Sequence, residues 1–124
     1  MEHRDKPIVL LVDDNEPTCT LVTAILHKDY GVDAASDGVE AIEKLRTKVY
    51  GAVILDLLMP RVNGFETIPK LRTKHPKVKI VAYTAVAGEF VRQEMARLGI
   101  PLVLKSGAFG RLDAVLTELG ATDS

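Results

Sequence analysis

The sequence predicts an α/β fold, a sandwich in which helices cover both faces of a parallel five-stranded sheet. Three observations lead to this prediction. Short runs of branched apolar residues alternate five times with segments whose apolar residues recur at helical spacing. These runs are apolar almost throughout, which is typical of strands buried on both faces. The chain has 124 residues, the length of one domain, and right-handed crossovers between parallel strands place helices on both faces.

Each predicted strand is a short apolar run that a turn-forming or polar residue ends. The first run follows Pro7 and stops at the acidic segment that begins with Asp13. The third run is a strong strand signal and ends at Asp56, whereas the second is weak. The predicted strands are 8–12, 32–35, 51–55, 78–83 and 101–104.

A predicted helix follows each strand. Pro17 suits the first turn of the first helix, where a missing N–H costs nothing, and Gly31 is expected to end this helix. Pro69 is expected to kink the third helix or to restrict its first turns. Gly99 is expected to cap the fourth helix. The predicted helices are about 17–30, 38–45, 65–74, 88–98 and 108–119, with a loop at 59–64.

Composition and charge exclude several classes of protein. Hydrophobic residues make up 47% and charged residues 27%, which excludes a disordered chain. The 16 basic and 17 acidic residues nearly cancel, without the concentrated basic surface of a nucleic-acid-binding protein. No apolar run approaches the roughly 20 residues of a membrane span, and the N-terminus lacks a signal-peptide core. The single cysteine, Cys19, fits a reducing compartment. We expect a cytoplasmic protein that binds neither nucleic acid directly nor membranes.

Five polar side chains follow the predicted strands. Asp13 and Asp14 follow the first strand, Asp56 the third, Thr84 the fourth and Lys105 the fifth. Ligands of doubly wound sheets bind beyond the carboxyl ends of the strands, so these side chains are predicted to converge in one crevice. Taken alone, an aspartate can cap a helix or end a strand, and a threonine or lysine can lie in a solvated loop. Chance explains the joint arrangement much less easily.

The residue types in this crevice suggest phosphoryl chemistry. Three neighbouring carboxylates repel one another unless a cation lies between them, and Mg²⁺ suits two or three carboxylates with water. Such an ion would also hold a phosphoryl group, to which Lys105 adds a positive charge and Thr84 a hydroxyl donor. An aspartate in the site could then act as a nucleophile and form an acyl phosphate.

With these motifs the sequence resembles the receiver (CheY-like) domain of two-component response regulators, from Val9 to about Leu119. The resemblance implies a flavodoxin-like, doubly wound sheet with strand order 2-1-3-4-5. Each motif is modest alone, and their order and spacing together make the resemblance specific. The matching motifs are LLVDDNE at 10–16, DGVEA at 37–41, DLLMP at 56–60, NGFE at 63–66, TA at 84–85 and LK at 104–105.

The resemblance implies a phosphoacceptor and a set of metal ligands. Asp56 would accept a phosphoryl group from a sensor histidine kinase or a phosphotransfer protein. Asp13 and Asp14 would hold Mg²⁺, or Mn²⁺, together with Asp56 and the main-chain carbonyl of Leu58. Leu58 is apolar where many relatives are polar, and this position influences how water reaches the acyl phosphate in the family.

The resemblance also implies a switch. Lys105 would pair with the phosphoryl oxygens, and Thr84 would move toward them and report their presence. Receivers usually carry an aromatic residue three positions before the lysine, and Leu102 stands at this switch position here. Receivers usually have a proline after the lysine, with a cis bond, whereas Ser106 follows here. The loop after Lys105 is therefore expected to be rebuilt or more mobile.

The implied function is a phosphorylation-driven signalling switch, without enzyme activity beyond its own phosphoryl transfer and autodephosphorylation. Residues 1–124 are expected to form a single receiver domain with a core at about 8–119, a short charged N-terminus and a frayed C-terminal tail. The output would be a downstream protein partner or a fused effector domain. We expect a monomer or a weak homodimer.

Two other functions have to be weighed. Leu102 and Ser106 motivate a degenerate receiver that serves as a phosphorylation-independent interaction module. A dehalogenase-type phosphatase would need a second acid two residues after the nucleophile, where Leu58 stands.

The basic stretch within 70–79 is expected to be a solvated face, with a docking surface for an acidic partner as the functional alternative. The histidines, His75 among them, are expected at the surface or at helix ends.

Overall fold

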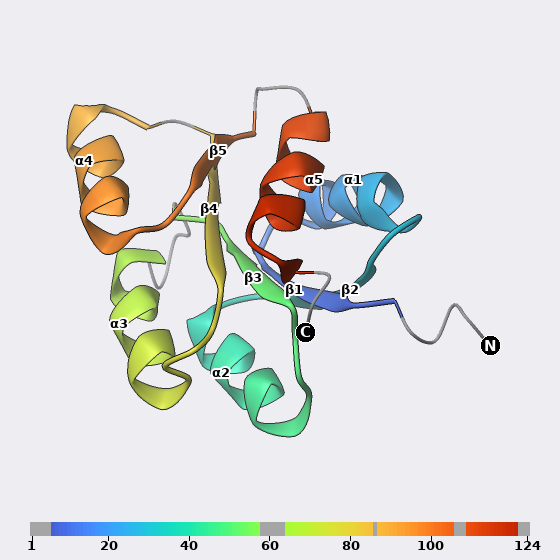
Figure 1. Cartoon of the computed structure of the whole chain (residues 1–124). Helices are drawn as coiled ribbons and strands as arrows, with labels where there is room; N and C mark the ends of the chain where they lie inside the picture. Colours follow the sequence, from blue (N-terminus) through green and yellow to red (C-terminus); the bar gives the residue numbers. More distant parts are fainter. Residues whose placement is uncertain (1–5, 58–63, 86, 106–108, 122–124) are drawn as a thin grey trace.

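A computed structural model describes residues 6–57, 64–85, 87–105 and 109–121 of the chain. Five parallel strands form one sheet in the order β2-β1-β3-β4-β5 (Figure 1), which confirms the predicted fold class and strand order. The strands are β1 (Ile8–Val12), β2 (Gly31–Ala35), β3 (Ala52–Leu55), β4 (Ile80–Thr84) and β5 (Leu102–Leu104). The helices are α1 (Glu16–Leu26), α2 (Gly38–Thr47), α3 (Gly64–Lys74), α4 (Glu89–Leu98) and α5 (Phe109–Glu118).

Each face of the sheet is buried in its own hydrophobic cluster, because successive strand residues point to opposite faces. Leu10 and Val53 belong to the cluster beneath α2, α3 and α4. Val9 and Ile54 belong to the cluster beneath α1 and α5, the two helices on the other side of the sheet in Figure 1. The helices contribute Ala41, Ile68, Leu71 and Met95 to the first cluster and Val22, Leu26, Leu112 and Leu116 to the second.

The first helix is shorter than predicted. It ends at Leu26, with His27 as its cap, and the N–H of Tyr30 donates to the carbonyl oxygen of Leu26 at 2.8 Å. This bond closes a turn that carries the Tyr30 ring into the core. Gly31 then begins β2, where its N–H donates to the carbonyl oxygen of Pro7 at 2.9 Å. The prediction that Gly31 ends the helix is therefore wrong.

Two other predicted helix features concern Gly99 and Pro69. Gly99 caps α4 with φ of 70°, in the left-handed region that favours glycine, and its N–H donates to the carbonyl oxygen of Ala96 at 3.1 Å. Pro69 lies inside α3, and the helix continues past it to Lys74. A proline has no N–H, so it offers no helical hydrogen bond to the preceding turn. The expectation that Pro69 kinks the helix or restricts its first turns stays a prediction.

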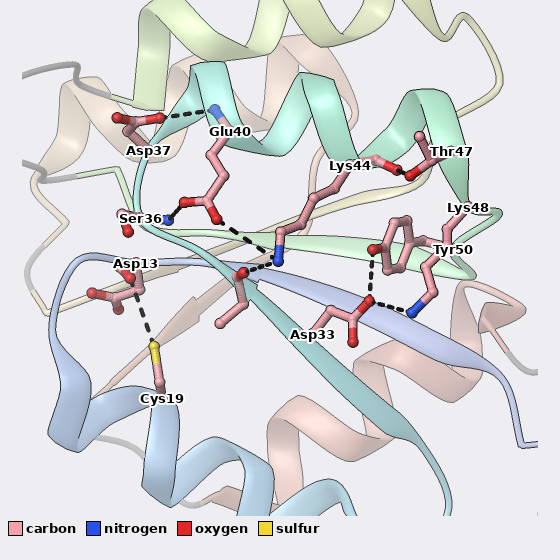
Figure 2. A network of polar contacts seen from close by, with 11 residues as sticks. Asp13, Cys19, Asp33, Ser36, Asp37, Glu40, Lys44, Thr47, Lys48 and Tyr50 are labelled. Carbon is pink, nitrogen blue, oxygen red and sulfur yellow. Dashed lines mark hydrogen bonds and ion pairs between the residues drawn. The ribbon is translucent and has the colours of Figure 1, made fainter.

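A polar network ties the outer edge of β2 to α2 (Figure 2). Asp37 caps α2 by accepting a hydrogen bond from the N–H of Glu40 at 2.9 Å, and the Glu40 carboxylate accepts one from the N–H of Ser36 at 2.7 Å. The Lys44 ammonium donates to the carbonyl oxygen of Ala34 at 2.8 Å and pairs with Glu40 at 3.7 Å. Side chains of α2 thus occupy two backbone groups at this edge.

Asp33 of β2 forms a second part of this network. Its Oδ2 accepts hydrogen bonds from the Lys48 ammonium at 2.8 Å and from the Tyr50 hydroxyl at 2.7 Å (Figure 2). Burial raises the pKa of the Asp33 carboxyl, but these two hydrogen bonds outweigh it and hold the pKa below its usual value. Burial and the same carboxylate raise the pKa of Tyr50 far above its usual value.

Helices α2 and α3 approach each other closely where α2 begins. A Cβ atom on Gly38 would lie 2.4 Å from Oγ1 of Thr67, a buried residue of α3. Real Cβ contacts essentially never come this close. A residue without a side chain is therefore required at this crossing.

Several expectations fall on residues outside the described ranges. They concern the Leu58 carbonyl, the loop at 59–63, Ser106 with the segment after it, the N-terminal residues 1–5 and the tail at 122–124. Within the ranges that the structure describes, every helix is too short or too polar to span a lipid bilayer. The predicted domain limits stay a prediction.

Candidate functional site

Asp13 and Asp14 lie directly after β1, at the carboxyl end of the sheet. The N–H of Asp13 continues the ladder by donating to the carbonyl oxygen of Ala35 at 3.0 Å, so the residue is held in place and buried. Asp14 is exposed. Asn15, rather than either aspartate, caps α1, since its Oδ1 accepts a hydrogen bond from the N–H of Thr18 at 2.9 Å. The two carboxylates are therefore not needed as helix caps.

Asp56 lies directly after β3, the neighbour of β1. Its N–H donates to the carbonyl oxygen of Val12 at 3.0 Å, and the residue is only 4% exposed. This pairing sets Asp56 beside Asp13. One carboxylate oxygen each from Asp13, Asp14 and Asp56 lie within 4.8 Å of one another. The predicted convergence of three carboxylates is confirmed.

Lys105 brings a positive charge into this cluster from the end of β5. Its ammonium donates to Oδ2 of Asp13 at 2.7 Å and lies 3.4 Å from Oδ2 of Asp56. Burial alone would lower the pKa of Lys105, but the hydrogen bond and charge of Asp13, followed by those of Asp56, outweigh it and raise the pKa. Lys105 is therefore a charged member of the site, not a solvated loop residue.

Thr84 ends β4 and is fully buried. Its carbonyl oxygen accepts a hydrogen bond from the N–H of Lys105 at 2.7 Å, so the two residues are held side by side at the carboxyl end of the sheet. Leu102 lies at the start of β5, paired with Ala82, and packs against the cluster beneath α4. Leu102 therefore lies at the far end of its strand from Lys105.

Two residues near the site were not predicted to belong there. The Cys19 thiol donates to the main-chain carbonyl oxygen of Asp13 at 3.6 Å (Figure 2), and burial followed by the charge of Asp13 raises the pKa of the thiol. Its position shortly after the Asn15 cap could have indicated this contact. The Lys105 ammonium lies 5.8 Å from the ring centroid of Tyr83, within the range of a cation–π contact. Tyr83 directly precedes the predicted site residue Thr84, and this position in the sequence could have indicated that Tyr83 lies near the site.

The arrangement suits a hard divalent cation and a phosphoryl group. Three carboxylates and one ammonium leave a net negative charge in a largely buried site, and Mg²⁺ prefers oxygen ligands of this kind. Asp13 and Asp56 are buried whereas Asp14 is exposed, so the cluster reaches solvent at Asp14. The donor set of this chain therefore fits a magnesium ion.

Comparisons with known proteins agree with this geometry. Residues 9–116 match the family described as response regulator receiver domain. The transcriptional regulatory protein ZraR of Klebsiella oxytoca is 31% identical over 112 residues, which are 89% of this chain and 25% of that protein. The hybrid signal transduction histidine kinase D of Dictyostelium discoideum is 37% identical over 98 residues, which are 77% of this chain and 6% of that protein. The chain thus spans a quarter or less of the length of these relatives.

A solved structure shares the fold of this chain. The response regulator protein TrrA of Thermotoga maritima, in complex with Mg²⁺ and a beryllium fluoride, matches with a TM-score of 0.81 and 30% identity. The match covers 91% of this chain and 98% of that one. The fold, the acidic cluster of Asp13, Asp14 and Asp56, and the matched residues all lead to one conclusion. The chain belongs to the receiver domain family of two-component response regulators.

Proposed function

We propose that this chain is a phosphorylation-driven switch in which Asp56 accepts a phosphoryl group from a sensor histidine kinase or a phosphotransfer protein. The observation that carries the proposal is the cluster at the carboxyl end of the sheet. A buried Asp56 lies within 4.8 Å of two further carboxylates and 3.4 Å from the Lys105 ammonium. A nucleophile, one cationic neighbour and two carboxylates that could bind a metal ion are thus held together before a donor arrives.

In the proposed transfer, a carboxylate oxygen of Asp56 attacks the phosphorus of a phosphohistidine on the donor. The new P–O bond forms as the P–N bond breaks, and the released imidazole nitrogen takes up a proton. An acyl phosphate remains on Asp56, and water later hydrolyses it. Positioning and neutralisation of charge are the main requirements of such a transfer. The Lys105 ammonium, already close to Asp56, would pair with the phosphoryl oxygens.

Asp13, Asp14 and Asp56, with the main-chain carbonyl of Leu58, would hold Mg²⁺ or Mn²⁺ in this site. When bound, the ion would neutralise the carboxylates and the negative charge of the incoming phosphoryl group. Lys105 would then give up its 2.7 Å contact with Asp13 and turn toward Asp56. Until the ion binds, the pair between Lys105 and Asp13 therefore offsets part of the negative charge of the carboxylates.

Thr84 and Leu102 would connect phosphorylation to a change of surface. Thr84 is buried beside Lys105, and a move of its hydroxyl toward the phosphoryl group would leave space behind it. Leu102 begins the neighbouring strand and packs against the cluster beneath α4. An aliphatic side chain at this position would respond by repacking within that cluster, without the ring movement of an aromatic residue.

The proposed role also specifies location and partners. The domain, residues 1–124 with a core at about 8–119, would act in the cytoplasm as a monomer or weak homodimer. Its output would be a downstream protein partner or a fused effector domain, without direct contact to nucleic acid or membrane. It would catalyse only its own phosphoryl transfer and autodephosphorylation.

The test is intact-protein mass spectrometry after incubation with Mg²⁺ and a small-molecule phosphodonor. The wild type and Asp29→Asn, a control at an exposed aspartate after α1, should each gain a single phosphoryl group. Asp56→Asn should gain none. An adduct on Asp56→Asn would overturn the assignment of the phosphoacceptor. A wild type that binds Mg²⁺ but stays unmodified would instead support the phosphorylation-independent interaction module.

A further inference from the structure

A groove lies at the amino end of the sheet, away from the acidic cluster. It is formed by the turn between α2 and β3 and the turn between α3 and β4, which Figure 1 places at the lower side of the view. Its volume is about 440 Å³, in the range of binding pockets. We call it the lysine-rimmed groove; its lining includes Leu45, Lys48, Val49, Lys74, His75 and Lys77.

The floor of the lysine-rimmed groove is apolar and held in place. Leu45 and Val78 are half-buried and pack against the core cluster on this face of the sheet. Tyr50 is fixed by its hydroxyl, which donates to Asp33 at 2.7 Å. Val49 stands beside them and is 82% exposed. A partner that covered Val49 would bury apolar surface without first having to order the floor.

The rim of the groove is positively charged. Lys74 and Lys77 are exposed, and neither forms an ion pair with any residue that the structure describes. Lys48 pairs with Asp33. Within the described lining of the groove there is no carboxylate to balance Lys74 and Lys77. The rim therefore complements an acidic partner.

A second hollow continues the groove along α2. It shares Lys74 and His75 with the lysine-rimmed groove and adds Ile42 and the ion pair of Glu43 with Arg46, at 3.2 Å. The shared residue His75 has a buried Nε2 without a hydrogen-bond partner among the described residues. Buried polar atoms without partners are rare in folded proteins. His75 directly follows α3, which confirms the expectation of a position at the surface or at a helix end, and the residue is half-buried.

We propose that the lysine-rimmed groove docks an acidic segment of a partner protein that carries an apolar anchor. The anchor side chain covers Val49, and carboxylates on either side of it pair with Lys74 and Lys77. A nucleic acid would make no use of the apolar floor, and a purely apolar surface would leave the lysines uncompensated. The combination of floor and rim therefore favours an acidic segment with an apolar residue in its middle.

This docking is independent of the proposed phosphorylation. The acidic cluster follows the carboxyl ends of β1 and β3, whereas the groove precedes the amino ends of β3 and β4. A variant without the phosphoacceptor, Asp56→Asn, is expected to bind the same segment with unchanged affinity. Failure of the switch and failure of the docking surface can thus be told apart.

The test uses the full chain and a synthetic peptide in which glutamates flank a leucine–phenylalanine pair. Titration of the peptide should shift the amide NMR signals of Val49, Lys74 and Lys77. Lys74→Glu combined with Lys77→Glu should weaken binding by about tenfold, because two attractive contacts become repulsive. Lys28→Glu, which reverses an exposed charge after α1, is the matched control and should bind like the wild type. Val49→Ser should also weaken binding.

Three results would overturn the proposal. The first is equal binding by the charge-reversed variant, and the second is equal binding by a peptide with lysines in place of the glutamates. The third is a shift of the groove signals on dilution of the protein alone, which would make a second copy of the chain the occupant. The variants at Lys28, Val49, Lys74 and Lys77 should fold like the wild type because these residues are exposed, and far-UV circular dichroism of every variant would verify its fold.

Discussion

The two ends of the β-sheet expose different chemistry. At the carboxyl end, buried aspartates surround one lysine, whose ammonium lies 2.7 Å from Asp13 and 3.4 Å from Asp56. At the amino end, exposed lysines surround an apolar floor with Val49 at its surface. Charges at the first end are close together and partly desolvated, so the stability of each charged group depends on the others. At the second end Lys48 pairs with Asp33, but the charges of Lys74 and Lys77 are solvated and are available to a partner.

This difference predicts unequal effects when a lysine is removed at either end. Lys105→Met should lower the free energy of unfolding by about 2 kcal/mol without Mg²⁺, because Asp13 keeps a buried charge without its partner. The same variant should bind Mg²⁺ more tightly, since a competing cation is gone. Urea unfolding with and without Mg²⁺ measures both effects.

A matched control exists at the amino end. Lys79 is also half-buried, but its ammonium donates to a neutral acceptor, the carbonyl oxygen of Gly120, at 2.8 Å. Lys79→Met should lower the free energy of unfolding by about 1 kcal/mol and leave the stabilisation by Mg²⁺ unchanged. If Lys105→Met and Lys79→Met lowered the free energy of unfolding equally and responded equally to Mg²⁺, the two ends of the sheet would not differ in how strongly their charges interact.

The crossing of α2 and α3 concerns both ends, because these helices run from the acidic end to the lysine-rimmed groove. Gly38→Ala should lower stability by about 1.5 kcal/mol, since the new Cβ would meet Oγ1 of Thr67. Adding Thr67→Ala should recover part of the loss. Gly88→Ala introduces a Cβ with nothing within 4 Å and should cost less. Thermal unfolding of the three variants and the wild type forms the test, and a Gly38→Ala protein as stable as Gly88→Ala would contradict it.

Magnesium should stabilise the carboxyl end through the carboxylates. At an Mg²⁺ concentration ten times the dissociation constant, mass action adds about 1.4 kcal/mol to the free energy of unfolding. Asp14→Ala should lose most of this gain, whereas Asp29→Ala, at an exposed site after α1, should keep it. Differential scanning calorimetry across a Mg²⁺ series measures the gain. An unchanged gain in Asp14→Ala would exclude Asp14 as a ligand.

The smallest effect is expected beside the groove, at Asp33. The pKa of this carboxyl is lowered in the folded protein, so its contribution to stability is present above the unfolded pKa of about 3.9 and is lost as the pH falls through the folded value. Asp33→Asn should therefore lower the free energy of unfolding by about 0.5 kcal/mol near neutral pH. The difference from the wild type should shrink below about pH 4. A difference that stays constant from pH 7 to acid, measured by urea unfolding, would argue against the ion pair with Lys48.

The sequence predicted the carboxyl end better than the amino end, for a physical reason. Buried parallel strands are apolar runs, so the polar residues that follow them, such as Asp13, Asp56 and Lys105, can be read directly and must meet at one edge. The groove joins two turns whose residues share no motif, so only the fold shows that Val49 and Lys74 lie near each other. The end of α1 was mispredicted because a core contact of Tyr30, rather than Gly31, turns the chain.

The network on the edge of β2 also bears on how this chain avoids edge-to-edge pairing with other copies. An exposed strand edge is a template for another strand and a common start of aggregation. Here the outward carbonyl of Ala34 is occupied by Lys44, and the outward N–H of Ser36 by Glu40 (Figure 2). An incoming strand would have to displace both side chains before it could pair. An ion pair that adds little to folding stability can in this way keep a sheet from growing.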